Sequence, residues 1–433
     1  MAILSSNTFY TRHHSEVSSY LTSNNKSLYI TGKVPTKNFS SFLNSDVLIL
    51  DLKKNIDDQI MDISNYDQII VTDIFELVSD IYKFLKIIEK KLKYDSTLII
   101  STINNIWNPF LILFEFLNLK KKSMRRSYIP IKKINTVAKS SGFGLINYYT
   151  RQYFPFNLFR FGNLINKLLE LVFFKFNFGI RTYLIFKKEA SKETKHLTKS
   201  IIVPAKNEEG NLKELINRIP NLGNDNEIII SCGHSKDNTL EIAKLIVNEN
   251  FDIKVIEQSG SGKANAVWEA LDISNGEIIA ILDADISVEP EALSDFFEVI
   301  EKDRGDFVNG TRLIYKMEKG AMRFINIVGN RVFQKFISTL IKQPITDSLC
   351  GTKVFKKELI LDIKKWQQKI KAVDPFGDYD LLFSAASSGK KILELPVHYK
   401  SRKYGKTQIS RFRDGFKLIK YLTYSFIIFN SSK

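Results

Sequence analysis

The C-terminal half of the chain alternates short apolar runs with segments of helical periodicity, and this alternation restricts the fold more than any other feature. Apolar runs of four to six residues bounded by polar or turn-forming residues are typical of buried strands. Helix-period segments between such runs favour a parallel sheet covered by helices, the α/β class. Ligands of these sheets bind beyond the carboxyl ends of the strands. The predicted strands are 200–204, 227–230, 253–256 and 277–282, and the predicted helices are one through Leu212, Leu215 and Ile216, then 240–247 and 264–271.

Two aspartates follow the fourth of these strands. Side chains alternate in extended backbone, so Asp283 and Asp285 point the same way, with Ala284 between them. Two carboxylates that converge at a strand end suit a hard cation, Mg²⁺ or Mn²⁺, with its other positions open to water or phosphate oxygens. Taken alone, an Asp-x-Asp sequence is more often a turn or a cap, so the interpretation depends on the segments around it.

Six further segments contain polar, glycine-rich or basic residues at predicted strand ends or in loops. One of them, GSGKA, opens a predicted helix, where backbone amides and a lysine can face a phosphate. The segments are 203–209 (VPAKNEE), 235–239 (SKDNT), 260–264 (GSGKA), 347–353 (DSLCGTK), 376–380 (FGDYD) and 402–407 (RKYGKT).

In this order the segments resemble the glycosyltransferases of family 2, which have the GT-A fold, and among them the polyprenyl-phosphate sugar transferases. The resemblance covers about residues 198–425. It implies a nucleotide-sugar donor, inversion at the anomeric carbon, and a divalent metal at Asp283 and Asp285. It also implies that 204–209 and Asp237 line the nucleobase and ribose, with Lys263 near the nucleotide. The residues assigned in this way to the donor are Pro204, Ala205, Asn207, Glu208, Asp237, Lys263, Asp283, Ala284 and Asp285.

The chain departs from the family pattern after its second predicted strand. Family members commonly have two acidic residues there, whereas this chain has Cys232-Gly233-His234. A carboxylate that accepts hydrogen bonds from the base is therefore missing or replaced. This departure concerns the identity of the nucleotide more than the class of reaction.

A departing nucleoside diphosphate needs positive charge that is in place before the reaction. Three basic residues on a glycine-containing segment, Arg402, Lys403 and Lys406, are predicted to close over the phosphates as a lid. Asp378 is the predicted general base if the acceptor is a hydroxyl. A polyprenyl phosphate is already largely ionised near neutral pH, and Asp378 would then orient it.

Each of these assignments has a structural alternative. Asp378 precedes an apolar run after a glycine, so the alternative is a helix cap. Asp347 and Lys353 are assigned to the acceptor or phosphate, and a plain surface ion pair between them is the alternative. Cys350 is predicted to be a small buried residue rather than a nucleophile.

The first half of the chain also alternates strands and helices. The segment 66–73 (YDQIIVTD), followed by a predicted helix and by the predicted strand at 97–101, resembles the middle of a class I methyltransferase that uses S-adenosylmethionine. The glycine-rich turn of those enzymes is absent, since only Gly32 follows the first strand, and Asp51 stands where a ribose-binding acid would be. We therefore predict a methyltransferase-like, Rossmann-type domain without activity. Its predicted elements are the strands 27–31, 47–51, 68–72, 97–101 and 182–186 and a helix near 77–92.

Positive charge is concentrated in the middle of the chain. Residues 101–200 contain 18 basic and 4 acidic side chains, a net of +14 out of +16 for the whole chain, and the basic residues are interleaved with phenylalanines. This pattern fits a helix lying in a membrane interface, with packing between domains as the alternative. No window is apolar enough for a membrane span, and no signal peptide is predicted. Two cysteines indicate a reducing compartment.

We therefore predict three segments: a methyltransferase-like domain at 1–188, a linker at 189–197 and a family 2 glycosyltransferase domain at 198–433. The expected place is the cytoplasm, with peripheral contact at the inner face of the cell membrane through residues 101–190, in the synthesis of cell envelope polysaccharide. No nucleic-acid partner is predicted. One alternative is a bifunctional protein with an active N-terminal methyltransferase and a sugar-binding C-terminal module. Another is a peripheral membrane scaffold.

Overall fold

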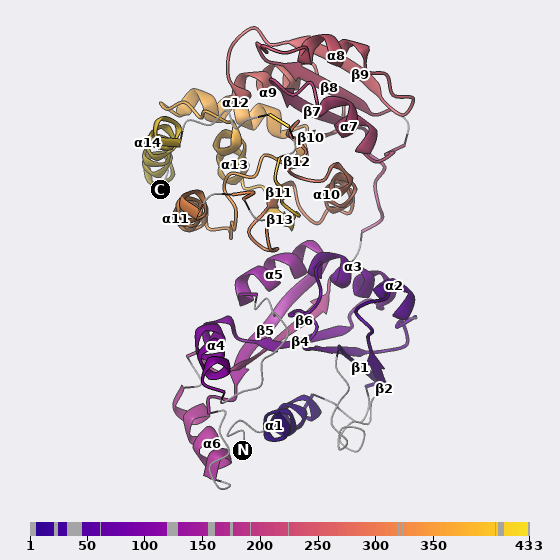
Figure 1. The fold of residues 1–433 in the computed structure, drawn as a ribbon, viewed down its shortest axis with the longest axis vertical. Coiled ribbons are helices and arrows are strands. Elements are labelled where there is room, and N and C mark those ends of the chain that lie inside the picture. The colour runs from indigo at the N-terminus through magenta and orange to yellow at the C-terminus, as the bar shows by residue number, and fades with distance from the viewer. Residues whose placement is uncertain are drawn as a thin grey trace. The chain divides into compact units, whose positions relative to one another are not determined.

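The computed structural model describes residues 6–20, 25–32, 46–60, 62–118, 129–154, 161–173, 176–190, 192–223, 225–318, 320–322, 324–402, 404–405 and 411–431. The chain divides into two compact units, unit 1 (Met1–Ser191) and unit 2 (Lys192–Lys433), which Figure 1 colours from indigo to magenta and from magenta to yellow. Within the described ranges, no helix has both the length and the apolar character needed to cross a membrane.

Unit 1 is built on a sheet with the strand order β2-β1-β3-β4-β6-β5. The first four strands are parallel, whereas β6 runs antiparallel to both β4 and β5. Strands β1 and β3 are buried along their whole length, as expected of central strands with apolar side chains on both faces. The strands are β1 (Ser27–Thr31), β2 (Asp46–Ile49), β3 (Gln68–Thr72), β4 (Thr97–Ile103), β5 (Phe143–Arg151) and β6 (Arg181–Lys188). The helices are α1 (Ser6–Ser18), α2 (Ile56–Gln59), α3 (Ile81–Lys91), α4 (Asn108–Phe116), α5 (Ile131–Ser140) and α6 (Phe161–Phe173), with a short 3₁₀ turn at Asn105–Trp107.

Unit 2 contains a sheet with the order β13-β11-β12-β10-β7-β8-β9. Its strands are β7 (Lys199–Ala205), β8 (Glu227–Cys232), β9 (Asp252–Glu257), β10 (Ile278–Ile281), β11 (Phe307–Thr311), β12 (Lys353–Lys356) and β13 (Ile392–Pro396). Its helices are α7 (Leu212–Arg218), α8 (Thr239–Leu245), α9 (Lys263–Asp272), α10 (Leu293–Glu301), α11 (Phe324–Ile341), α12 (Leu359–Lys369), α13 (Asp378–Ser387) and α14 (Arg411–Ser431).

Helices pack against the sheet of unit 2 and bury its apolar strands. Helix α9 packs on β7 and β8, and α10 packs on β11 and β12 (Figure 1). The core extends to the C-terminal helices, where Trp366 of α12 stacks on Phe383 of α13 with ring centroids 5.8 Å apart. The Trp366 indole donates to the Tyr421 hydroxyl of α14 at 2.6 Å, so the indole nitrogen is buried without losing a hydrogen bond.

The predicted strands are confirmed in both units to within two residues, and the chain is mixed α/β with two sheets rich in parallel pairs. The four strands predicted in unit 2, β7 to β10, pair in parallel as expected. Strand β12, which is not among the predicted strands, runs antiparallel to β10 and to β11. The reason is geometric. The chain returns to the sheet at the carboxyl end of β10, opposite Ile281, so β12 can only run backwards from there.

Candidate functional site

The carboxyl edge of the unit 2 sheet brings together residues that are far apart in the sequence. Strands β7, β8 and β10 are parallel and end at this edge. Asp283 and Asp285 follow β10 directly. Lys353 begins β12 opposite Ile281, so the loop before β12 arrives at the same place. Figure 1 shows these strands within unit 2, between the α7–α8 and α12–α13 helices.

Asp283 forms an ion pair with Lys263, the first residue of α9, at 2.5 Å. Burial alone would raise the pKa of Asp283, but the Lys263 ammonium, together with Lys353 and Arg402, holds it below its usual value. Gly351 lies against this pair. A Cβ added at Gly351 would be 1.9 Å from Asp283 Oδ2 and 2.7 Å from Lys263 Nζ, so any side chain at this position would displace the ion pair.

Asp285 forms an ion pair with Arg402, whose Nη2 lies 2.7 Å from Oδ2, and accepts a hydrogen bond from the Ser287 amide at 2.9 Å. The residues after Arg402 reach the end of β7. The Tyr404 hydroxyl donates to Glu209 at 3.0 Å, and a Cβ at Gly405 would be 3.5 Å from the Asn207 carbonyl oxygen. Of the three basic residues predicted to form a lid, Arg402 lies at this edge, while Lys403 and Lys406 lie outside the described residues, so the lid stays a prediction.

Asp378 forms a buried ion pair with Lys353 at 2.6 Å, and Lys353 also donates to the Cys350 carbonyl. The alternative of a capping role for Asp378 is wrong, because Asp378 is the first residue of α13 and its carboxylate makes no cap hydrogen bond. Asp374 caps the start of α13 instead, because it accepts hydrogen bonds from the amides of Tyr379 at 2.6 Å and Asp380 at 3.0 Å.

Asp347 is fully buried, and its partner is Arg312 rather than Lys353, so the surface ion pair predicted as an alternative is wrong. Arg312 donates to both carboxylate oxygens, at 2.7 and 2.8 Å, and the Asn330 amide adds a third hydrogen bond at 2.6 Å. Burial would raise the pKa of Asp347, but Arg312 more than offsets it and the pKa falls to about 2. Asp347 thus fixes the loop that contains Gly351.

The predicted nucleotide segment follows β7. Asn207 adopts a left-handed backbone with φ of 55°, and its side chain accepts from the Lys236 amide at 2.7 Å. Glu208 is buried, which raises its pKa to about 7, with Asp285 adding to the shift. Asp237 accepts from the Thr239 amide at 3.2 Å, at the start of α8.

The other donor residues assigned from the resemblance line the same edge. Pro204 and Ala205 are the last residues of β7, with Pro204 half-buried and Ala205 buried. Ala284 is buried between the two aspartates.

The chemistry of Asp283 and Asp285 fits a divalent cation of the magnesium type. Such ions take one or two carboxylates and complete their shell with water and phosphate oxygens. The Asp283 side chain remains one-third exposed, at 34%. Both carboxylates have a cationic partner within the chain, and no group of three or more His, Cys, Asp or Glu residues is arranged for a metal in the part of the chain that the structure describes.

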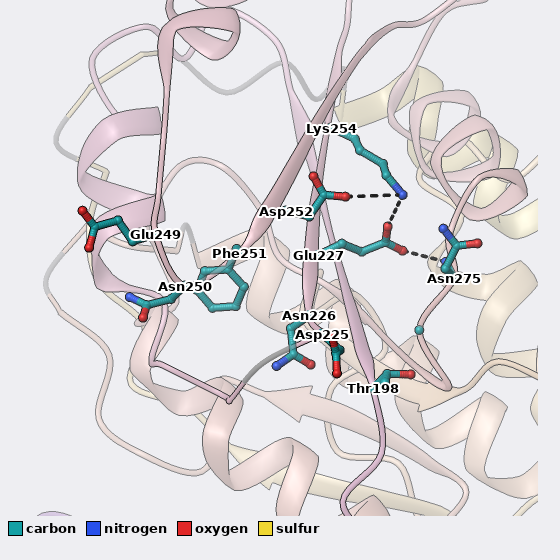
Figure 2. Close-up of a pocket in the computed structure, with 11 residues that line it drawn as sticks. Thr198, Asp225, Asn226, Glu227, Glu249, Asn250, Phe251, Asp252, Lys254 and Asn275 are labelled. Atoms are coloured by element: carbon teal, nitrogen blue, oxygen red, sulfur yellow. Dashed lines mark hydrogen bonds and ion pairs between the residues drawn. The ribbon is translucent and has the colours of Figure 1, made fainter.

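A cavity of about 590 Å³ lies at the other edge of the sheet, at the amino ends of β7 to β10. Figure 2 shows Lys254 in this cavity between Glu227 and Asp252, at 2.5 and 3.8 Å, and Glu227 also accepts from the Asn275 amide at 2.6 Å. These groups satisfy one another, and none of the predicted site residues lines the cavity. The predicted site residues gather instead at the carboxyl edge of the sheet, away from this cavity.

Sequence reasoning did not single out the groups that hold the site in place. Gly351 and Glu209 lie in the segments 347–353 and 203–209, but the sequence predicts no function for either residue. Arg312 follows β11, and Asp374 precedes α13. The sequence Asp-Pro-Phe-Gly-Asp at 374–378 is a usable signal for Asp374, because an acid just before an apolar helix is a common start signal.

Comparisons with known proteins agree with this arrangement. The family model for glycosyl transferase family 2 matches residues 200–363. Glycosyltransferase AglJ of Haloferax volcanii is 30% identical over 218 residues, which cover 50% of this chain and 67% of that protein. From the same organism, the low-salt glycan biosynthesis hexosyltransferase Agl6 is 26% identical over 231 residues (52% and 53%), and dolichyl-phosphate hexose transferase is 27% identical over 218 residues (50% and 88%).

The matched part of the chain spans about half the length of Agl6 and two thirds of AglJ. The family match includes Lys263, Asp283, Asp285 and Gly351 but ends before Asp378 and Arg402. It supports the GT-A expectation for unit 2. On these grounds the chain is a glycosyltransferase and belongs to glycosyl transferase family 2.

Proposed function

We propose that this protein transfers a sugar, with inversion, from a nucleotide-sugar donor to a polyprenyl-phosphate or other glycan-precursor acceptor. The observation that supports this most directly is the alternation of three cations with three carboxylates at one sheet edge: Lys263 with Asp283, Arg402 with Asp285, and Lys353 with Asp378. The relatives named as a hexosyltransferase and a dolichyl-phosphate hexose transferase support the same substrate classes.

The donor side of the site is built for a diphosphate. Lys263 and Arg402 are held by carboxylates in the free protein, so their charges are oriented before a donor arrives. When a diphosphate binds, both cations exchange a carboxylate for phosphate oxygens and stabilise the charge that develops on the leaving group. A divalent cation, Mg²⁺ or Mn²⁺, held by Asp283 and Asp285 would supply Lewis-acid stabilisation to the same oxygens.

The acceptor side is formed by Asp378 and Lys353. Their buried ion pair fixes both side chains beside the Cys350 carbonyl. With a phosphate acceptor, Lys353 attracts the anionic headgroup and Asp378 sets its position. With a hydroxyl acceptor, Asp378 takes the proton as general base.

The test is a sugar-transfer assay with a panel of radiolabelled nucleotide sugars, with and without Mn²⁺. Asp285→Asn removes one negative charge at constant size, and we expect it to lower transfer by at least roughly 100-fold, since a misplaced charge in the transition state costs that much. Asp272→Asn is the matched control, because Asp272 is an exposed carboxylate of the same unit at 59% exposure, paired only with Lys364 among the described residues. Full activity of Asp285→Asn after chelation of metal would exclude the metal from the reaction.

We further propose that unit 1 is a methyltransferase-like domain without activity. The strand order, with β6 antiparallel between β4 and β5, supports the likeness. The absence of a glycine-rich turn after β1 supports the loss of activity. Helix α1 packs on the sheet, where Tyr10 donates to Asp73 at 2.5 Å and His13 hydrogen-bonds Tyr183 at 2.9 Å. Calorimetry with S-adenosylmethionine should show no binding. Tight binding would instead favour a bifunctional protein.

Membrane contact is the remaining part of the proposal. A polyprenyl-phosphate acceptor lies at a membrane surface, and a role in cell envelope polysaccharide synthesis places the protein at the inner face. The excess of basic residues in 101–190 supports peripheral contact through that stretch.

A further inference from the structure

Helix α6 exposes most of its apolar side chains. Its buried residues are Gly162 and Asn166. Asn166 accepts from the Phe154 amide at 3.1 Å and donates to Glu170 at 2.8 Å, and Glu170 in turn accepts from the Gln152 amide at 3.2 Å. Six apolar side chains of the helix are between 40% and 73% exposed, namely Phe161, Leu164, Leu168, Leu171, Val172 and Phe173.

Helix α4 shares this character. It buries none of its residues, and Phe110, Ile112, Leu113 and Phe116 are 48% to 80% exposed. The Trp107 indole, at the start of α4, donates to the Phe178 carbonyl after α6 at 2.6 Å. Strands β4 and β6 pair so that Ile103, before α4, lies opposite Arg181, after α6. Helices α4 and α6 are therefore connected to the sheet at the same edge. Figure 1 draws α4 and α6 at the same end of unit 1.

Helices in water are stabilised mainly by burying an apolar face. Neither α4 nor α6 buries an apolar face against the described residues. We therefore infer that these faces are covered by something outside unit 1. Contiguous exposed apolar surface of this kind marks an interaction site.

Charge indicates what covers the two helices. Residues 105–178 contain twelve basic and two acidic side chains, a net of +10. One of the two acids, Glu170, accepts hydrogen bonds from within the unit. A second copy of this chain would bring two strongly positive surfaces together, whereas an anionic lipid surface offers both an apolar phase and opposite charge.

We propose that α4 and α6 insert their apolar faces into an anionic membrane surface, to which the net positive charge of residues 105–178 attracts unit 1. This inference rests on the membrane-contact part of the proposed function and is independent of sugar transfer.

The experiment is co-sedimentation of the full chain with phosphatidylcholine vesicles, with and without phosphatidylglycerol, at low and high salt. We expect binding to the anionic vesicles that weakens in high salt. The triple variant Leu164→Gln, Leu168→Gln, Leu171→Gln keeps helix propensity and removes three exposed leucines, and should lower the partition coefficient by roughly 100-fold or more. The control Leu245→Gln with Val247→Gln alters residues that are at least as exposed in unit 2 and should bind like the wild type.

A second measurement locates the contact. Trp107 is one of three tryptophans, and the others, Trp268 and Trp366, lie in unit 2. Vesicles with brominated acyl chains should quench tryptophan fluorescence, and Trp107→Phe should remove most of that quenching. Unchanged quenching in Trp107→Phe would place the contact elsewhere and overturn the proposal.

Three other results would also overturn it: full vesicle binding by the triple variant, equal binding to neutral and anionic vesicles at all salt concentrations, and self-association of the wild type that the triple variant abolishes without any vesicle binding. Sugar transfer to a water-soluble acceptor should be the same in the triple variant as in the wild type. Failure of the proposed reaction is thereby distinguishable from failure of membrane attachment.

Discussion

Gly351 gives the sharpest test of the site geometry. Gly351→Ala places a methyl group 1.9 Å from Asp283 Oδ2 and 2.7 Å from Lys263 Nζ, whereas ordinary contact begins at 3.4 Å. The carboxylate must therefore move by about 1.5 Å, or the ion pair with Lys263 must open. Both atoms are ends of side chains, so we expect only about 1–3 kcal/mol of lost stability.

The effect on catalysis should be much larger than the effect on stability. A displacement of about 1 Å in a reacting group costs roughly 100-fold, so kcat/KM of Gly351→Ala should fall by at least that factor. The assay is transfer from the radiolabelled donor that the wild type uses, together with thermal denaturation. Gly329→Ala, within α11, is the matched control, since a Cβ there meets nothing within 4 Å. A folded Gly351→Ala protein with kcat/KM within threefold of the wild type would refute the placement of Asp283 in the reaction.

Two further predictions concern buried charge. Lys353→Met leaves Asp378 buried without its counter-ion and should lower the free energy of unfolding, measured in urea, by about 3–5 kcal/mol. The double variant Lys353→Met with Asp378→Asn should recover part of this loss. Strictly additive effects of the two substitutions would contradict the pairing. Burial raises the pKa of Glu394 to about 7, so between pH of about 4.5 and 7 the unfolded chain holds fewer protons than the folded one, and stability falls as pH rises. In Glu394→Gln, the fall in the free energy of unfolding over this pH range should be smaller by up to roughly 3 kcal/mol. Identical pH profiles for the wild type and the variant would contradict a raised pKa at Glu394.

Local patterns in the sequence predict strands β1 to β4 and β6 to β10, whereas β5, β11, β12 and β13 are not among the predicted strands. The same patterns predict that the site residues converge at the ends of strands. The runs around Ile202, Ile229 and Ile279 are buried because they are apolar throughout, and their carboxyl ends meet because parallel strands end at one edge. That rule predicted that Lys263, Asp283 and Asp285 would lie together.

The choice of ion-pair partners could not be predicted in the same way. Lys353 meets Asp378 rather than Asp347 because β12 runs backwards and α13 starts beside it, and Arg312 takes Asp347 across a separation of 35 residues. Such pairings depend on the path of the chain in space, which hydrophobic periodicity does not record. The outward-facing leucines of α6 illustrate a similar limit, because periodicity marks an apolar stripe without saying what it faces.

The ion pairs of the site join residues that are far apart in the sequence, and this limits how far the protein can be shortened. The recognised family segment stops at residue 363, yet the counter-charges of Lys353 and Asp285 come from Asp378 and Arg402, beyond that point. A chain cut there would also deprive β11 of its outer neighbour, β13. The residues after 363 therefore belong to the unit that forms the candidate site. A fragment that ended at the family boundary would leave Lys353 and Asp285 without their counter-ions and would expose β11 as an edge strand.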